Sequence, residues 1–377
     1  MSRASRLQAF ADQDPSNPIL LCDLLDELLA EGRVDEAFAR LRSAPADLQT
    51  LTAVKFREAR CAMQRQDFAG VVRILQPLMA GIAEPPAGIA HDLAYAQCAL
   101  GLFDEAWRTL ATVQAQGDDA VAISLLKARV LYGQKQYDTA LDVLEPISGG
   151  SRLAEVRGLR ALLLLDKGET SRAAAEAGQA RAIDADQHEA CLVAGTVALW
   201  EHRVDESQAT FQHVLATHPH SGRALLGLGQ CRMLRADVTA ARGVLEHAAA
   251  EMPGHIGTWH ALAWCQLLEG DLAGARHSFD RAFAIDRTFG ETHGGFALVH
   301  ALRGERHEAE ESIKRATRLD PDGPSARYAR SVLLLDEGRP EEARKIIDGI
   351  LMQSPGNAMA VPADFIYRLR ELVRPKG

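Results

Sequence analysis

The sequence predicts an all-α protein, built as a solenoid of about ten helical hairpins that are each about 34 residues long. Three observations indicate this fold. One small, mostly alanine position recurs every 33 to 35 residues, apolar columns accompany it at helical spacing, and a glycine often stands five residues before it. With 377 residues, the chain also exceeds the length over which one hydrophobic core keeps growing, whereas a repeat array needs no single core.

We call the recurring small position the marker. Its ten residues are Ala37, Val71, Ala106, Ala140, Ala173, Ser207, Ala241, Ala275, Ala309 and Ala343. Nine of the ten residues that lie twelve positions earlier are small, and these ten are Leu25, Ala59, Ala94, Ala128, Ala161, Gly195, Gly229, Ala263, Ala297 and Ser331. Every residue four positions after the marker is apolar, from Leu41 to Ile347. Residues three or four apart share a helix face, so each unit contains two helices that approach closely through small residues.

Glycine and proline mark the ends of these helices. Five residues before the marker stand Gly32, Gly101, Gly168, Gly270, Gly304 and Gly338, where we expect a left-handed turn between the two helices of a unit. Prolines follow the second helix in four units, at Pro219, Pro253, Pro321 and Pro355. Each unit is therefore predicted to be a helical hairpin.

The elements follow in order along the chain. Residues 1–17 are expected to form an N-terminal capping helix, because Asp14-Pro15-Ser16-Asn17 repeats the phrase that ends a unit. Residues 18–153 then hold repeats 1 to 4, and residues 154–357 hold repeats 5 to 10. Residues 358–377 form a C-terminal capping helix with one apolar face, made by Phe365, Ile366, Leu369, Leu372 and Val373.

Repeat spacing is least regular in the first half of the array, where Gln66 and Lys135 replace the turn glycine. The segment Ser148-Gly149-Gly150-Ser151 lengthens one connection between units. A kink is expected there, and two half-arrays hinged near Gly150 fit the sequence equally well.

A 34-residue helix-turn-helix unit with these columns resembles the tetratricopeptide repeat (TPR) family, in the form of a bacterial multi-repeat array. The units from Thr258 to Asp286 and from Glu291 to Pro321 match the family's columns best, and the resemblance covers nearly the whole chain. It implies a right-handed α-α superhelix in which the first helices of successive repeats line a concave groove. It also implies a protein or peptide partner.

Three columns of the first helices, at fifteen, eleven and eight residues before the marker, are expected to face that groove. Its N-terminal part is polar and aromatic, whereas its C-terminal part is apolar with two large rings. The candidate partner-binding residues are Arg60, His91, Tyr95, Arg129, Tyr132, His260, Trp264, Leu298 and Tyr328. An exposed apolar strip of this length usually marks a binding surface.

Two alternatives to a binding groove remain open. The apolar inner residues Leu192, Leu226, Leu298 and Val332 could pack against neighbouring second helices. Alternatively, the amphipathic helix expected at 358–377 could fold back into the groove as an internal plug.

Composition limits the classes of partner. Apolar residues make up 47% and charged residues 25% of the chain, which are the proportions of a folded protein. The 51 acidic and 42 basic side chains give a net charge of −9, which disfavours affinity based on neutralising nucleic-acid phosphates. No stretch approaches the ~18 apolar residues of a membrane span, and no leader segment is apparent, so we expect a cytoplasmic protein.

Motifs for catalysis and for cofactors are missing, so we expect neither an enzyme nor a bound cofactor. The sequence has no phosphate loop, nucleophile elbow or His-Glu-x-x-His motif, and Gly227-Leu228-Gly229 falls within a predicted helix. The six cysteines are too widely spaced for a zinc or redox pair. Twelve of the 13 histidines lie between His188 and His307, but no register supplies i,i+4 pairs or converging carboxylates, so we expect no metal site.

The sequence therefore favours a non-catalytic scaffold that binds a peptide, helix or protein in its groove, with an unknown oligomeric state. Two alternatives are a regulatory or substrate-recruiting subunit of an enzyme on a separate chain, such as a glycosyl- or sulfotransferase, and an assembly factor for a secretion or envelope complex. The clamp that some family members use for acidic chaperone tails needs paired Asn and Lys. Only Asn17 and Asn357 occur in this chain, both in turns, which excludes that clamp.

Overall fold

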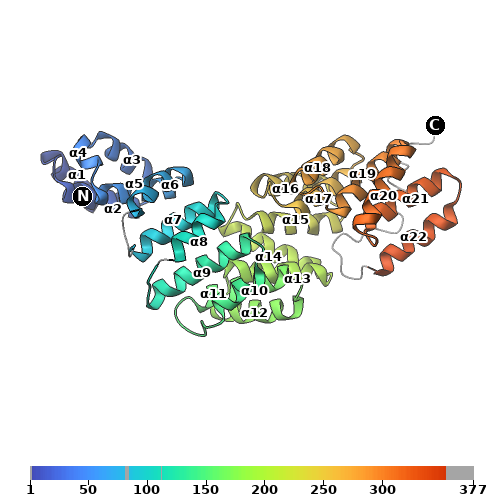
Figure 1. Ribbon diagram of the computed structural model, residues 1–377, viewed down its shortest axis with the longest axis horizontal. Helices are drawn as coiled ribbons and strands as arrows, with labels where there is room; N and C mark the ends of the chain where they lie inside the picture. Colours follow the sequence, from blue (N-terminus) through green and yellow to red (C-terminus); the bar gives the residue numbers. More distant parts are fainter. Residues whose placement is uncertain (1, 81–84, 112, 354–377) are drawn as a thin grey trace. The chain divides into compact units, whose positions relative to one another are not determined.

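The computed structural model describes residues 2–80, 85–111 and 113–353 (Figure 1). These residues form 22 α-helices and no β-strand. The chain divides into two compact units, Met1–Ala173 and Ala174–Gly377. The division falls inside one helix rather than in the connection around Gly150. The all-α repeat architecture predicted from the sequence is confirmed, and the assignment of individual repeats to domains stays a prediction.

The first unit contains α1 (Arg3–Gln13), α2 (Pro18–Ala30), α3 (Val34–Ser43), α4 (Ala46–Gln49), α5 (Thr52–Gln64), α6 (Phe68–Met79), α7 (Ala87–Ala99), α8 (Phe103–Ala111), α9 (Gly117–Gly133), α10 (Tyr137–Leu144) and α11 (Leu153–Asp166). Helix α12 (Thr170–Ile183) crosses the division. The second unit contains α13 (His188–Trp200), α14 (Val204–Thr217), α15 (Gly222–Leu234), α16 (Val238–Glu251), α17 (Ile256–Leu268), α18 (Leu272–Ile285), α19 (Gly290–Arg303), α20 (Arg306–Leu319), α21 (Pro324–Asp336) and α22 (Pro340–Gln353).

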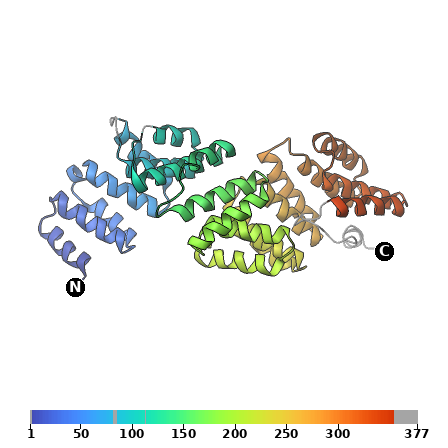
Figure 2. The same cartoon turned by 90° about the horizontal axis from the view of Figure 1, so that it is seen from below.

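These helices follow one another as ten consecutive pairs, from α2 and α3 to α21 and α22, with α1 and the short α4 in addition. Within each unit, the two helices of a pair lie side by side and run in opposite directions (Figures 1 and 2). The helix expected at 358–377 lies outside the described residues.

The marker position is buried in every helix pair. All ten marker residues have a relative exposure of 0%, including Val71 and Ser207. The residues twelve positions earlier are buried as well. In the sixth pair the two columns touch directly, because the Ser207 hydroxyl donates a hydrogen bond of 2.8 Å to the carbonyl oxygen of Gly195. The predicted close approach of the two helices is therefore confirmed.

The turn between the two helices is left-handed in all ten pairs. The six predicted glycines have φ angles between 73° and 85°. In the other four helix pairs this position is occupied by Gln66, Lys135, His202 and Ala236, with φ angles of 58° to 61°. A residue with a Cβ atom is strained in this region, so the repeat geometry imposes the turn even where the sequence lacks glycine.

Glycines in the second unit make room for large rings. An added Cβ atom at Gly227 would overlap the ring of Phe211, and one at Gly295 would overlap the ring of Phe279. Both rings are almost fully buried. Gly227 therefore has a packing role, in agreement with its position inside α15. No helix of the described residues has the length and apolar character that crossing a membrane requires.

We expect Ala236→Gly to stabilise the protein by roughly 0.5–1 kcal/mol, because glycine adopts the left-handed turn without strain. Ala209→Gly is the matched control. Ala209 is exposed inside α14, so this change should lower the free energy of unfolding by about 1 kcal/mol. Thermal unfolding of both variants, followed by circular dichroism, measures these changes in stability. Destabilisation by Ala236→Gly would show that the turn carries no strain.

We expect Ala275→Leu to destabilise the protein by about 1–3 kcal/mol, because the marker has no space for three more carbon atoms. The same change at the exposed Ala209 should stay within about 0.5 kcal/mol of the parent. Denaturant titrations of the two variants compare these effects, and equal losses would contradict the assigned packing.

Candidate functional site

The predicted groove residues of the first unit differ in exposure. Arg60 on α5 has 52% of its side chain exposed, and Tyr95 on α7 is 45% exposed. His91 on α7 and the α9 residues Arg129 and Tyr132 are partly buried. The first unit thus presents a charged group and an aromatic ring to solvent on neighbouring first helices.

Arg60 belongs to a three-residue charge cluster with Arg57 and Asp26. The Arg57 guanidinium donates hydrogen bonds to both Asp26 carboxylate oxygens, at 2.6 and 3.2 Å, and Arg60 donates one at 3.1 Å. The hydrogen bonds that Arg57 donates to Asp26 raise the pKa of Arg57. Because one carboxylate serves two guanidinium groups, the cluster keeps one positive charge, and Arg60 is its more exposed end.

Tyr95 is held by two other rings. It stacks on His91, with ring centroids 6.5 Å apart and planes 17° apart, and it meets Phe68 edge-on at 6.0 Å. These contacts fix the ring while leaving almost half of its surface exposed. A fixed, exposed aromatic ring is a typical anchor of a protein interface, because little conformational entropy is lost on binding.

A hollow of about 210 Å³ lies between α5 and α7, next to this charge cluster. Its apolar lining comes from Phe56, Ala59, Leu75 and Ile89. Arg57, Arg60 and Asp92 supply the charged part of its lining. An apolar floor with charged groups around it suits one apolar side chain of a partner, flanked by polar backbone groups.

Arg129 and Tyr132 do not line this hollow. The Tyr132 hydroxyl donates a 2.5 Å hydrogen bond to Asp166 of the next pair, and its ring lies 5.9 Å from that of Tyr137. Arg129 lies near Cys98, whose thiol pKa is raised by burial and lowered by the arginine charge, with burial the larger effect. The structure thus brings Arg60 together with the hollow and ties Tyr132 to its neighbouring helix.

The four candidates in the second unit require a correction, because the structure buries them. Relative exposures are 8% for His260, 5% for Trp264, 0% for Leu298 and 3% for Tyr328. The Trp264 and Tyr328 rings meet edge-on at 5.7 Å within one apolar cluster that also contains Leu298. Side chains packed in this way offer almost no surface to a partner, so they are not part of the site we propose.

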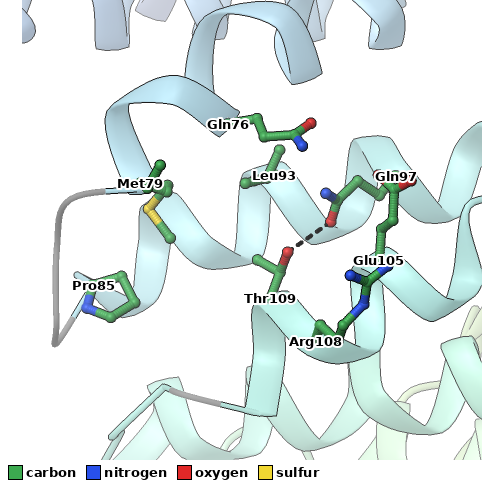
Figure 3. A pocket seen from close by; sticks show the side chains of 9 residues that line it. Gln76, Met79, Pro85, Leu93, Gln97, Glu105, Arg108 and Thr109 are labelled. Carbon is green, nitrogen blue, oxygen red and sulfur yellow. Dashed lines mark hydrogen bonds between the residues drawn. The ribbon is translucent and has the colours of Figure 1, made fainter.

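Sequence reasoning missed a second hollow in the first unit, of about 380 Å³, between α6, α7 and α8 (Figure 3). Its lining residues are Gln76, Met79, Ala80, Pro85, Leu93, Gln97, Glu105, Arg108 and Thr109. The buried Gln97 accepts a 2.9 Å hydrogen bond from the Thr109 hydroxyl, so its amide is satisfied within the protein.

A repeat-wide signal could have located Gln97. Gln266 occupies the same column, nine residues before the marker, and accepts a 2.7 Å hydrogen bond from Ser278. In both helix pairs the hydroxyl residue, Thr109 or Ser278, stands three residues after the marker. A Gln at the first position with a Ser or Thr at the second therefore predicts a buried hydrogen bond across the hairpin.

The cysteines pack as small apolar side chains. Five of the six are buried, and none is in a disulfide. Burial raises the pKa of Cys61 to about 11 and that of Cys265 to about 12, so both thiols stay protonated at neutral pH. Protonated thiols are poor nucleophiles and poor metal ligands.

Comparison with family models finds the tetratricopeptide repeat in three stretches of the chain. One model of this family matches residues 91–145 and 296–358, and a second matches residues 198–265. No curated protein sequence is significantly similar to the chain.

Among solved structures, a monomeric mutant of IFIT1 with m7Gppp-AAAA has a TM-score of 0.55 over 95% of this chain and 90% of its own, at 14% identity. That likeness concerns the fold. Two smaller proteins align with about half of the chain. YrrB, a TPR protein with an unusual peptide-binding site, is 21% identical over 52% of this chain and 97% of its own, with a TM-score of 0.37. TTC0263 of Thermus thermophilus is 25% identical over 49% of this chain and 98% of its own, with a TM-score of 0.39.

The buried His260 makes stability depend on pH. Desolvation lowers its pKa to about 4, and its Nε2 atom lies 2.9 Å from the Thr292 hydroxyl. Between its unfolded pKa near 6.5 and about 4, the unfolded chain binds a proton that the native state does not, so stability falls as the pH falls. We expect a loss of about 3 kcal/mol at most across this range.

His260→Gln removes this titration and is the test variant. As the pH is lowered from 7 towards 4, the thermal midpoint of the parent should fall more than that of the variant. A difference that does not change with pH would show that His260 is not held neutral in the fold.

Proposed function

Since the chain is a tetratricopeptide repeat protein, we propose that it is a non-catalytic interaction scaffold that binds an extended segment of a protein partner across α5 and α7. Proteins of this family are generally interaction scaffolds rather than enzymes. The net charge of −9 supports a protein partner over a nucleic acid.

The observation that carries this proposal is the exposed Tyr95 ring on α7, one helical turn after Asp92, which lines the hollow between α5 and α7. Tyr95 is 45% exposed yet held by His91 and Phe68, and the hollow has an apolar floor. Rigid aromatic rings and apolar pockets are typical of the few positions that dominate binding energy at protein interfaces. None of the residues lining this hollow pairs a nucleophile with a base, which supports binding rather than catalysis.

Charge defines the proposed partner more closely. The cluster of Asp26, Arg57 and Arg60 keeps one positive charge, and its exposed end is Arg60. A carboxylate of the partner is therefore favoured at the exposed Arg60 guanidinium and not at the part of the hollow lined by Asp92, which would repel it. The partner segment that fits best carries an apolar side chain for the hollow and an acidic residue close to it in sequence.

Peptides selected on the full chain by phage display provide the test. We expect the selected sequences to combine an apolar residue with a nearby acidic one. Tyr95→Ala should weaken binding of a selected peptide by about 2 kcal/mol at any ionic strength, because it removes packing. Arg60→Ala should weaken binding most at low ionic strength, because it removes a charge.

Two exposed residues outside the site are matched controls. Phe10→Ala removes an exposed ring on α1, and Arg73→Ala removes an exposed charge on α6. Calorimetric titration at two salt concentrations should give parental affinity for both. The proposal is wrong if the Tyr95 and Arg60 variants also bind like the parent, or if the controls lose as much affinity.

A further inference from the structure

Three metal-ligating side chains converge in the second unit, away from the proposed peptide site. His220 lies in the turn before α15, and His247 and Glu251 lie one turn apart on α16. The Nδ1 atom of His220 is 2.7 Å from Glu251 Oε1, and the Nε2 atom of His247 is 3.3 Å from the same oxygen. All three side chains are exposed, and their ligand atoms lie within 4.8 Å of one another.

The repeat geometry creates this convergence. His247 and Glu251 are spaced i,i+4 and therefore share one face of α16. Gly222 begins α15 against the end of α16, where an added Cβ atom would overlap Met252 and lie 3.3 Å from the Glu251 Cβ atom. The missing side chain at Gly222 lets the turn approach α16 closely. His220, two residues earlier, is thereby brought to Glu251.

The spacing of these atoms agrees with one coordination sphere. Zinc binds imidazole nitrogen and carboxylate oxygen at about 2.0–2.2 Å, which places neighbouring ligand atoms of a tetrahedron about 3.3 Å apart. The separation of 3.3 Å between His247 Nε2 and Glu251 Oε1 matches this value, whereas the 2.7 Å between His220 Nδ1 and the same oxygen is a hydrogen-bond distance and must lengthen when an ion binds. Two imidazoles and one carboxylate with solvent access form a three-ligand set that leaves a fourth position for water or a donor from another molecule.

We propose that His220, His247 and Glu251 bind one divalent transition-metal ion, for which Zn²⁺ is the best match. The two imidazole ligands disfavour Mg²⁺ and Ca²⁺, which take oxygen ligands. The ion connects the turn before α15 to the last turns of α16 and so ties together both ends of one helix pair. The expectation of no metal site overlooked His247 and Glu251, which are an i,i+4 pair in the sequence, and could not connect them to His220, which is 31 residues from Glu251.

The competing explanation is that these side chains form only hydrogen bonds and ion pairs. Hydrogen bonding to His220 lowers the pKa of Glu251, as such pairing predicts. Both explanations involve the same three residues, so a stability measurement without metal does not separate them. Binding of metal to the purified chain does.

Calorimetric titration of the full chain with Zn²⁺ is the first measurement. We expect one ion to bind per chain at micromolar concentration. We expect binding to weaken by more than about tenfold in each of the variants His220→Ala, His247→Ala and Glu251→Gln. Even substitutions of residues that only hydrogen-bond to metal ligands weaken metal binding by about tenfold or more. Substitution by Co²⁺ should give the visible absorption of a nitrogen- and oxygen-ligated ion, without a thiolate charge-transfer band.

His218→Ala is the matched control. His218 lies in the same turn, two residues before His220, but its ring faces His188 at a centroid distance of 4.5 Å. We expect this variant to bind Zn²⁺ like the parent. The proposal is overturned if the parent binds no Zn²⁺, if the three ligand variants bind like the parent, or if His218→Ala loses binding to the same extent. Circular dichroism of each variant verifies that the exposed substitutions leave the fold intact.

Discussion

The close approach of two helices at the marker position is the constraint on which the rest of the molecule depends. Ten residues spaced 33 to 35 apart are all completely buried there, although their side chains are no larger than valine. Each of them faces a residue that is usually Ala, Gly or Ser on the partner helix. Because this contact leaves no space, it fixes the distance between paired helices and hence the position of the turn between them. The left-handed backbone at Gln66 and Ala236 shows that the contact outweighs local backbone preference.

A scaffold fixed in this way frees the remaining helix surfaces to differ between repeats. On α5 and α7 the inner columns carry Arg60, His91 and Tyr95, which remain wholly or partly exposed. On α17 and α21 the corresponding columns carry Trp264 and Tyr328, which are buried against each other. The same backbone thus supports a wet, charged surface in one unit and a packed aromatic contact in the other. Binding capacity is therefore a property of particular repeats rather than of the array as a whole.

Contacts between residues about one repeat apart create the chemistry of both proposed sites. Asp26 meets Arg57 and Arg60 across 31 and 34 residues, and His220 meets Glu251 across 31. Neither set is a local motif, since Asp26 on α2 reaches α5, and His220 in the turn before α15 reaches α16. The proposed peptide site and the proposed metal site also lie in different units.

The sequence by itself determined the helical content, the 34-residue period, the pairing of helices and the six left-handed turns that contain glycine, because these features depend on residue size and spacing, which recur along the chain. Only the tertiary structure decided which inner residues are exposed. Tyr95 and Tyr328 are both large rings in inner columns, but the first keeps 45% of its surface and the second 3%. The exposure of a side chain depends on the volume of the side chains that surround it on neighbouring helices. The residue's own position in the repeat does not give that volume. The convergence of His220, His247 and Glu251 was hidden for the same reason, since it requires the distance between two helices.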